Sequence, residues 1–219
     1  MSILAVGSGA RHPGSGRSLR KLLALPLAAL LAFLIAGPSS ADDALTSDGI
    51  VQALTPKHKT RGIGDAGGVL TPQQDEFING LKGRTRQILV EERTELTKVV
   101  KEADLPALDL EIYFDFDSSA ITPRAVPTLI KLGQALSSDQ LKAASFLISG
   151  HTDAKGAADY NQHLSEARAA SVKAFLVGNF QVDALRLISV GYGKEDLKNP
   201  SDPEAAENRR VTIVNLVAR

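Results

Sequence analysis

Several charged and amide side chains lie at predicted strand ends or on a predicted helix, where they need ionic or hydrogen-bond partners. Asp153 closes the segment Gly150-His-Thr-Asp153, which follows an apolar run, and loops at strand ends are where binding groups collect. Arg168 lies on or beside the apolar stripe of the helix predicted to follow, and an unpaired buried guanidinium is costly. Asp153 is its natural partner. Asn161 offers a hydrogen-bond donor and acceptor near the same helix start.

More polar residues flank the other predicted strands. Asp117 follows the first of them, and Asn208-Arg-Arg210 precedes the last. Two interpretations of these groups stay open from the residues alone. They form either a set of structural ion pairs and caps, or a binding site.

Catalysis has weaker support in the sequence. His151 and Asp153, with His163 nearby, could serve as metal ligands or as an acid–base pair. However, the chain has no H-E-x-x-H motif and no third ligand at a suggestive spacing. We therefore expect no enzyme activity, no cofactor and no metal, with a metal-dependent hydrolase as the alternative.

The elements that must position these residues form one predicted α+β domain over residues 109–219. Strand patterns occupy Glu111–Asp117, Ala144–Gly150, Arg186–Gly191 and Arg210–Val217. Helix patterns begin at Thr122-Pro123 and at about Ala158, the second running to Val177. The order β-α-β-α-β-β predicts a two-layer sandwich, with two helices on one face of a four-stranded mixed sheet.

The same patterns assign inward-facing residues. Alternation in the first strand turns three apolar side chains inward: Ile112, Phe114 and Phe116. The second helix is predicted to face the sheet with Leu164, Ala167, Ser171 and Phe175. Gly178 is the predicted stop of that helix.

Residues 1–41 have the pattern of a signal peptide. Basic residues and no acidic ones precede the uncharged run Leu22–Ala36, and small residues end the segment at Ala41. The run is shorter than the roughly 20 residues of a membrane-spanning helix, and Pro26 interrupts it. We expect cleavage after Ala41, with an uncleaved inner-membrane anchor as the alternative.

Two segments separate this leader from the domain. Residues 42–70 are rich in Gly and show no sustained apolar period, which predicts a flexible arm or linker. Residues 71–108 predict one long amphipathic helical segment, with Thr71 as N-cap and Pro72 in the first turn. Its apolar stripe could pack on the following domain, on a second copy in a homodimer, or on another envelope protein.

Composition excludes several classes of protein. The 219-residue chain has no Cys, which excludes disulfide scaffolds, thiol nucleophiles, thiolate zinc sites and lipid-modified cysteines. Its 25 basic residues balance 25 acidic ones, and it has no Trp and three Tyr. Such a chain lacks the charge and the stacking surface of a nucleic-acid-binding protein, so we expect no nucleic-acid partner.

Residues 110–219 resemble the OmpA-like C-terminal domain of bacterial envelope proteins. Four blocks match in order, and Asn208-Arg-Arg-Val211 follows the last of them: Phe114-Asp-Phe-Asp-Ser-Ser119, Gly150-His-Thr-Asp153, Asn161-x-x-Leu-Ser-x-x-Arg-Ala169 and Gly191-Tyr-Gly. The resemblance implies a β-α-β-α-β-β core. It also implies noncovalent binding of peptidoglycan through the diaminopimelate of its peptide stem.

The resemblance carries over residue by residue. Asp153 and Arg168 match the family residues that hold the ammonium and the carboxylate of diaminopimelate, and the two charge types suit such a zwitterion. Asn161, Asp117 and Arg209 match further contact positions, and Thr152 and Leu164 supporting ones. We therefore expect a periplasmic, wall-associated protein of Gram-negative bacteria, with a possible link to the outer membrane. A stator-like protein with a retained N-terminal helix is the alternative.

Overall fold

The computed structural model describes residues 45–56, 70–84 and 88–216. The predicted leader and residues 57–69 of the predicted arm lie outside these ranges. Within the described ranges, no helix combines the length and the apolar character that crossing a membrane requires.

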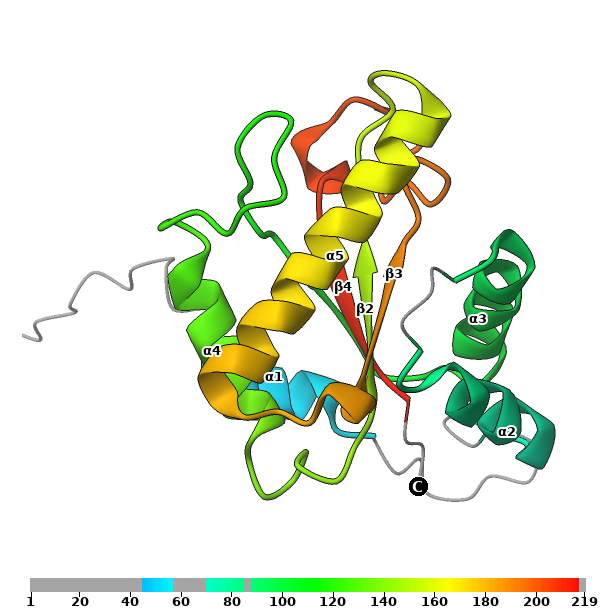
Figure 1. Cartoon of the computed structure of the whole chain (residues 1–219), viewed down its shortest axis with the longest axis vertical. Coiled ribbons are helices and arrows are strands. Elements are labelled where there is room, and N and C mark those ends of the chain that lie inside the picture. The colour runs from blue at the N-terminus through cyan, green and yellow to red at the C-terminus, as the bar shows by residue number, and fades with distance from the viewer. Residues whose placement is uncertain (1–44, 57–69, 85–87, 217–219) are drawn as a thin grey trace, which may run out of the picture. The chain divides into compact units, whose positions relative to one another are not determined.

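A four-stranded sheet forms the centre of the domain (Figure 1). Its strands are β1 (Ala107–Leu110), β2 (Phe146–Gly150), β3 (Leu187–Gly191) and β4 (Val211–Asn215), in the order β1-β4-β2-β3. β3 runs parallel to β2, whereas β4 pairs antiparallel with both β1 and β2. The predicted mixed sheet is therefore confirmed.

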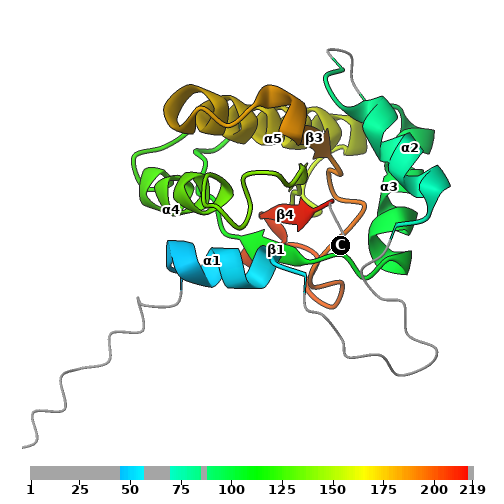
Figure 2. The ribbon, with the colours of Figure 1, turned by 90° about the horizontal axis from the view of Figure 1, so that it is seen from below.

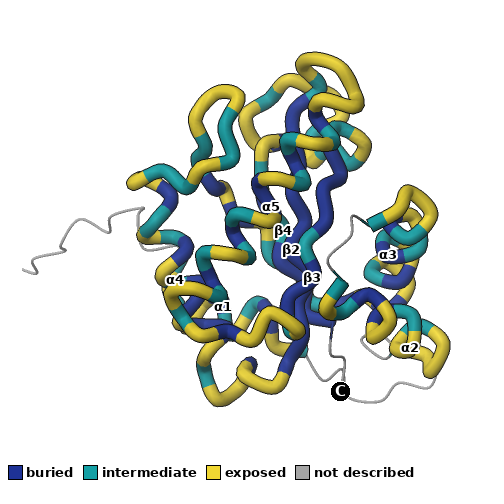
Figure 3. The backbone as a smooth tube through the Cα atoms, viewed as in Figure 1, coloured by how far each residue is buried: buried dark blue, intermediate teal, exposed yellow. Residues whose placement is uncertain are grey.

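Two helices cover one face of this sheet, as predicted. They are α4 (Val126–Leu136) and α5 (Ala158–Phe180), and they enclose a core with the inward side chains of the strands, including Phe146, Ile148 and Ile213. Short 3₁₀ turns, η1 (Ala184–Arg186) and η2 (Ala206–Asn208), precede β3 and β4. Figure 3 shows β2, β3 and β4 almost wholly buried, whereas the helices have exposed outer surfaces. The edge strand β1 is partly exposed.

Part of the predicted flexible arm is instead a helix of the same core. α1 (Ser47–Leu54) is capped by Thr46, whose hydroxyl accepts a hydrogen bond from the Gly49 backbone N–H at 3.0 Å. Ile50 and Leu54 are fully buried in the cluster that contains α4 and α5. The helix has only eight residues, so its few apolar positions are too short a period to stand out in the sequence.

The predicted long helix of residues 71–108 is two helices, α2 (Pro72–Leu81) and α3 (Val90–Glu102). Thr71 caps α2, as predicted, and Gly83 has a left-handed conformation (φ +69°) after its end. The apolar side chains of both helices pack on the second face of the sheet, against Leu147, Ile188 and Val214. The apolar stripe therefore packs on the following domain, which adds a third layer (Figure 2).

The first strand lies earlier than predicted. β1 ends at Leu110, which pairs with Val211 at the start of β4, so residues beyond Leu110 have no strand beside them. Ile112 is still buried, but Phe116 is 99% exposed. The alternating pattern correctly predicted that Ile112 is buried and wrongly predicted the same for Phe116. Alternation in a sequence does not show whether a partner strand exists.

The inward face of α5 is shifted by one residue from the prediction. Its buried residues are Asn161, Ser165, Arg168, Ala169, Val172 and Leu176. The prediction aligned the stripe on Leu164 and Phe175, but the sheet accepts small and polar residues because α5 passes very close to Gly150 and Gly191. The helix also continues through Gly178 to Phe180, and Gln181 takes the left-handed position at its end.

Candidate ligand-binding site

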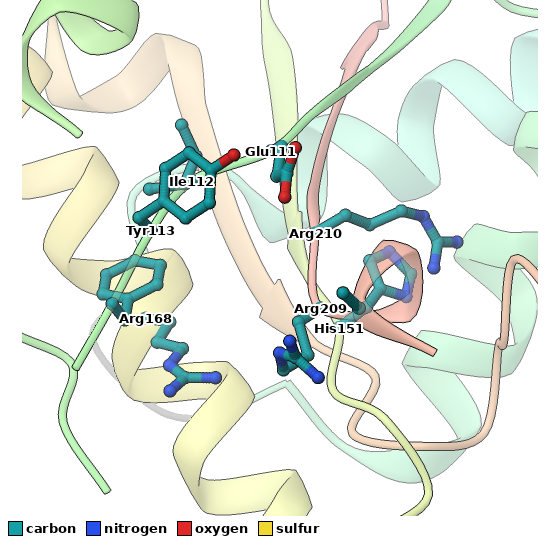
Figure 4. Close-up of a pocket in the computed structure, with 9 residues that line it drawn as sticks. Glu111, Ile112, Tyr113, His151, Arg168, Arg209 and Arg210 are labelled. Carbon is teal, nitrogen blue, oxygen red and sulfur yellow. The ribbon is translucent and has the colours of Figure 1, made fainter. Parts of the chain in front are cut away.

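The candidate residues gather at one end of the sheet, where β2 and β3 end and β4 begins. A cavity of about 120 Å³ lies there (Figure 4). Its lining combines cationic groups with residues that follow β1: Glu111, Ile112, Tyr113, Phe114, His151, Arg168, Ala206, Arg209 and Arg210. The structure thus brings Arg168 and Arg209 to one cavity from elements far apart in the sequence.

Asp153 forms an ion pair with Arg209 and none with Arg168. Its Oδ2 lies 2.8 Å from Arg209 Nη1, and its Oδ1 accepts a hydrogen bond from the Lys155 backbone N–H at 3.1 Å. The predicted pairing of Asp153 with Arg168 is therefore wrong. Asp153 is buried whereas the Arg209 side chain is about half exposed, so Arg209 can move away from the carboxylate at little packing cost.

Arg168 is held by backbone carbonyls. Nε donates to the Ser118 carbonyl at 3.0 Å, Nη2 donates to the Asp115 carbonyl at 3.4 Å, and the guanidinium lies 4.9 Å from the centre of the Phe114 ring. Burial lowers the pKa of Arg168, against the opposing effect of Tyr160. Among the described residues, no acid pairs with Arg168 and no group accepts from its Nη1. This donor is left for a ligand.

The carbonyls that hold Arg168 belong to a turn over residues 115–118, which we call the 115–118 turn. It is closed by the Ser118 N–H donating to the Asp115 carbonyl at 3.2 Å. Asp117 within it has a left-handed conformation (φ +51°), and its Oδ1 accepts a hydrogen bond from the Tyr160 hydroxyl at 2.6 Å. This bond raises the pKa of Tyr160. Asp117 thus lies on the turn that Arg168 anchors.

Asn161 and Thr152 lie behind the site, outside the cavity lining. Asn161 is buried, and its Nδ2 donates to the Lys155 carbonyl at 2.6 Å, which fixes the loop after Asp153. The backbone N–H of Thr152 donates to the Gly193 carbonyl at 2.8 Å, while its buried hydroxyl meets no partner among the described residues. Leu164 is half-buried on the neighbouring face of α5. The geometry suits Asn161 and Thr152 to support Asp153.

Two cavity residues were named from the sequence but not assigned to the binding site. His151 is buried, stacks on Tyr192 with ring centres 5.4 Å apart, and has its pKa lowered to about 4 by burial and by Arg210. Arg210 forms ion pairs with Asp109 and Asp196. Arg210 follows Arg209 directly in the sequence, and this pair of adjacent arginines was the feature that could have placed Arg210 at the site.

The arrangement can bind a charged ligand without breaking bonds in it. Three guanidinium groups line the cavity, the imidazole is neutral near pH 7, and the Asp153 carboxylate lies within reach of Arg209. A carboxylate would be attracted to the guanidinium groups, and an ammonium to Asp153. In the described part of the chain, no group of three or more side chains is placed to hold a metal ion.

Comparison with known proteins identifies related sequences over the C-terminal half of the chain. The sequence profile of the OmpA family matches residues 113–210. The peptidoglycan-associated lipoprotein of Haemophilus influenzae is 37% identical over 113 residues, which cover 51% of this chain and 72% of the lipoprotein. Outer membrane porin F of Pseudomonas aeruginosa is 33% identical over 109 residues, 50% of this chain but only 30% of the porin.

Solved structures also match. The peptidoglycan-associated lipoprotein of Burkholderia pseudomallei has 30% identity and a TM-score of 0.41, covering 48% of this chain and 87% of that one. The OmpA-like domain of FopA1 from Francisella tularensis has 20% identity and a TM-score of 0.43, covering 49% of this chain and 70% of that one.

Proposed function

The chain belongs to the OmpA family, and from this premise we propose that it is a non-catalytic envelope protein that binds peptidoglycan noncovalently. The diaminopimelate of the peptide stem is the group recognised. Its free end is a zwitterion, which requires an anion for the ammonium and a forked cation for the carboxylate. The protein helps to anchor or organise the envelope by this attachment.

The observation that carries the proposal is the exchangeable pair of Asp153 and Arg209 beside the unused donor of Arg168. An incoming ammonium replaces Arg209 at Asp153, and the ligand carboxylate then binds Arg168 Nη1 together with the released Arg209. The charges stay balanced during this exchange, because each buried charge leaves one partner as it gains another. Asp117 and Asn161 hold the elements on either side.

We assign the protein to the periplasm, at the cell wall. The proposed organisation is a signal peptide over residues 1–41, a segment over 42–108 whose described helices pack on the domain, and the wall-binding domain over 109–219. Mass spectrometry of the protein from cell fractions tests the leader: a mature N-terminus at Asp42 supports export with cleavage, and an intact leader indicates a stator-like anchor.

Binding to purified sacculi tests the site. Wild-type protein is expected to sediment with sacculi and to be released by free diaminopimelate. Asp153→Asn keeps the size of the side chain but removes the charge, so it should abolish sedimentation. Lys155→Ala is the matched control, because its exposed side chain contacts Glu204 rather than the cavity. Release that does not respond to diaminopimelate, or wild-type binding by Asp153→Asn, would contradict the assignment.

A further inference from the structure

Phe116 is the most exposed large apolar side chain in the described part of the chain. Its exposure is 99%, whereas Ile112 is buried and Phe114 is half-buried in the same segment. Single exposed apolar residues are common at protein surfaces. Phe116 differs from an incidental one because its backbone is fixed, and because the side chain that fixes it, Arg168, also lines the ligand cavity.

The backbone that carries Phe116 is tied at both ends. The Arg168 guanidinium donates to the Asp115 and Ser118 carbonyls, which flank Phe116 on either side. The Tyr160 hydroxyl holds Asp117 from α5. Phe116 is therefore displayed by a turn anchored to a helix at two points.

The same guanidinium joins the 115–118 turn to the cavity, because Arg168 also lines the cavity wall. When one residue of a polymer is bound in the cavity, the rest of the polymer must run over the protein surface next to the cavity. At the turn, that surface consists of an aromatic ring, the exposed carboxylates of Asp115 and Asp117, and the partly exposed Tyr160 ring.

This combination suits an uncharged ring that bears hydroxyl groups. The aromatic face packs on the apolar C–H face of a sugar, and carboxylate oxygens accept hydrogen bonds from sugar hydroxyls. The two carboxylates disfavour an anionic lipid surface and the acidic part of a peptide stem. Of the components of peptidoglycan, the glycan strand fits best.

We propose that Phe116 is a specificity-determining residue that packs against an N-acetylated hexosamine ring of the glycan strand while the peptide stem occupies the cavity. The inference rests on the proposed function, since the stem must first be held by Asp153 and Arg168. It adds a second point of contact, so that the protein distinguishes wall polymer from free stem peptide.

Two soluble ligands test this inference on the full chain. One is a disaccharide–tripeptide with diaminopimelate, and the other is the same tripeptide without sugars. Phe116→Ala is expected to weaken binding of the disaccharide–tripeptide by about fivefold and to leave tripeptide binding unchanged. Phe116→Trp should retain the sugar-dependent gain. Ile130→Ala, an exposed apolar residue of α4, should change neither affinity.

The outcomes separate this inference from the function on which it rests. If the wild type binds the tripeptide but gains nothing from the sugars, the Phe116 inference is overturned and the proposed function stands. If Phe116→Ala weakens both ligands equally, the ring contacts the stem and the inference is again overturned. If the wild type binds neither ligand, the proposed function itself fails.

Discussion

The two central charged residues of this site, Arg168 and Asp153, are held by partners other than each other. Arg168 is fixed by two backbone carbonyls and an aromatic ring rather than by a carboxylate. Asp153 keeps one oxygen for the loop and one for Arg209. The sequence could predict that Arg168 is buried and needs partners. It could not predict which partners, because backbone carbonyls carry no residue-type signal.

Removing Arg168 should therefore lower stability as well as binding. Arg168→Ala leaves the Ser118 carbonyl without its donor, removes one of the two donors to the Asp115 carbonyl, and uncovers the Phe114 ring. We therefore expect the free energy of unfolding to fall by about 2 kcal/mol. Urea denaturation measures the loss. Arg124→Ala is the control, since Arg124 is an exposed cation stacked 3.6 Å from the Tyr113 ring and should lose less than about 1 kcal/mol. Equal losses would show that the carbonyl contacts contribute nothing.

His151 should make stability depend on pH. Its pKa falls from the ordinary 6.5 to about 4 in the folded protein, chiefly because of burial. As the pH drops from 6.5 to 4, the unfolded chain takes up a proton that the folded chain does not. The free energy of unfolding therefore decreases over this range, by up to about 3 kcal/mol at its lower end.

Urea denaturation at pH 7 and pH 4.5 measures this effect. His151→Phe keeps a ring against Tyr192 but cannot titrate, so its stability should fall less than that of the wild type between the two pH values. Parallel losses in the two proteins would assign the pH dependence to the carboxylates instead.

Secondary structure elements were predictable where local pattern and tertiary packing agree. Helix α4 and strands β2, β3 and β4 lie within or close to the predicted ranges. β1 was misplaced because a strand needs a neighbour, and the start of β4 determines where that neighbour is. The face of α5 was misread because the prediction was aligned on Leu164 and Phe175, whereas the polar Ser165 and Arg168 point inward.

Glycines explain why α5 accepts such residues. A Cβ on Gly150 would lie 2.3 Å from the Ser165 carbonyl oxygen, and one on Gly191 would lie 2.4 Å from the Glu166 backbone nitrogen. Both glycines therefore permit a backbone approach that no other residue allows. This contact places the buried start of α5, with Asn161 and Arg168, beside the loop that carries Asp153.

Gly150→Ala should separate α5 from the sheet. The clash is with backbone, so we expect a loss of about 2 kcal/mol or more in the free energy of unfolding, together with weaker binding to sacculi. Gly178→Ala is the matched control, because a Cβ there meets no atom within 4 Å. Within the exposed part of α5 it should stabilise by about 0.5–1 kcal/mol. Thermal melts of both variants measure these changes in stability. An unchanged melting temperature for Gly150→Ala would contradict the close approach of α5 to the sheet.

At the scale of the whole molecule, segments upstream of the domain are part of its packing. The α2–α3 pair covers one face of the sheet, and α1 completes the core on the other. Arg93 of α3 donates to the Gly191 carbonyl at 3.1 Å, at the end of β3. Sequence patterns predicted an apolar stripe in residues 71–108 but not its target, since an amphipathic face does not specify what covers it.

The contribution of α1 can be measured directly. Leu54 is fully buried, and its carbonyl accepts a hydrogen bond from the buried Asn215 Nδ2 at 2.8 Å, which ties α1 to the end of β4. Leu54→Ala removes core side-chain volume, so we expect a loss of about 3 kcal/mol in the free energy of unfolding.

Gln52→Ala, on the exposed face of the same helix, should stay within about 0.5 kcal/mol of the wild type. Equal stability of the Leu54→Ala and Gln52→Ala proteins in urea would show that residues 47–54 do not contribute to the core and act as a linker. The expected difference instead means that the wall-binding domain begins before residue 109. A fragment starting there would lose the α2–α3 cover of one face of the sheet and the α1 part of the core on the other. It should unfold at lower urea concentration than the chain from residue 42.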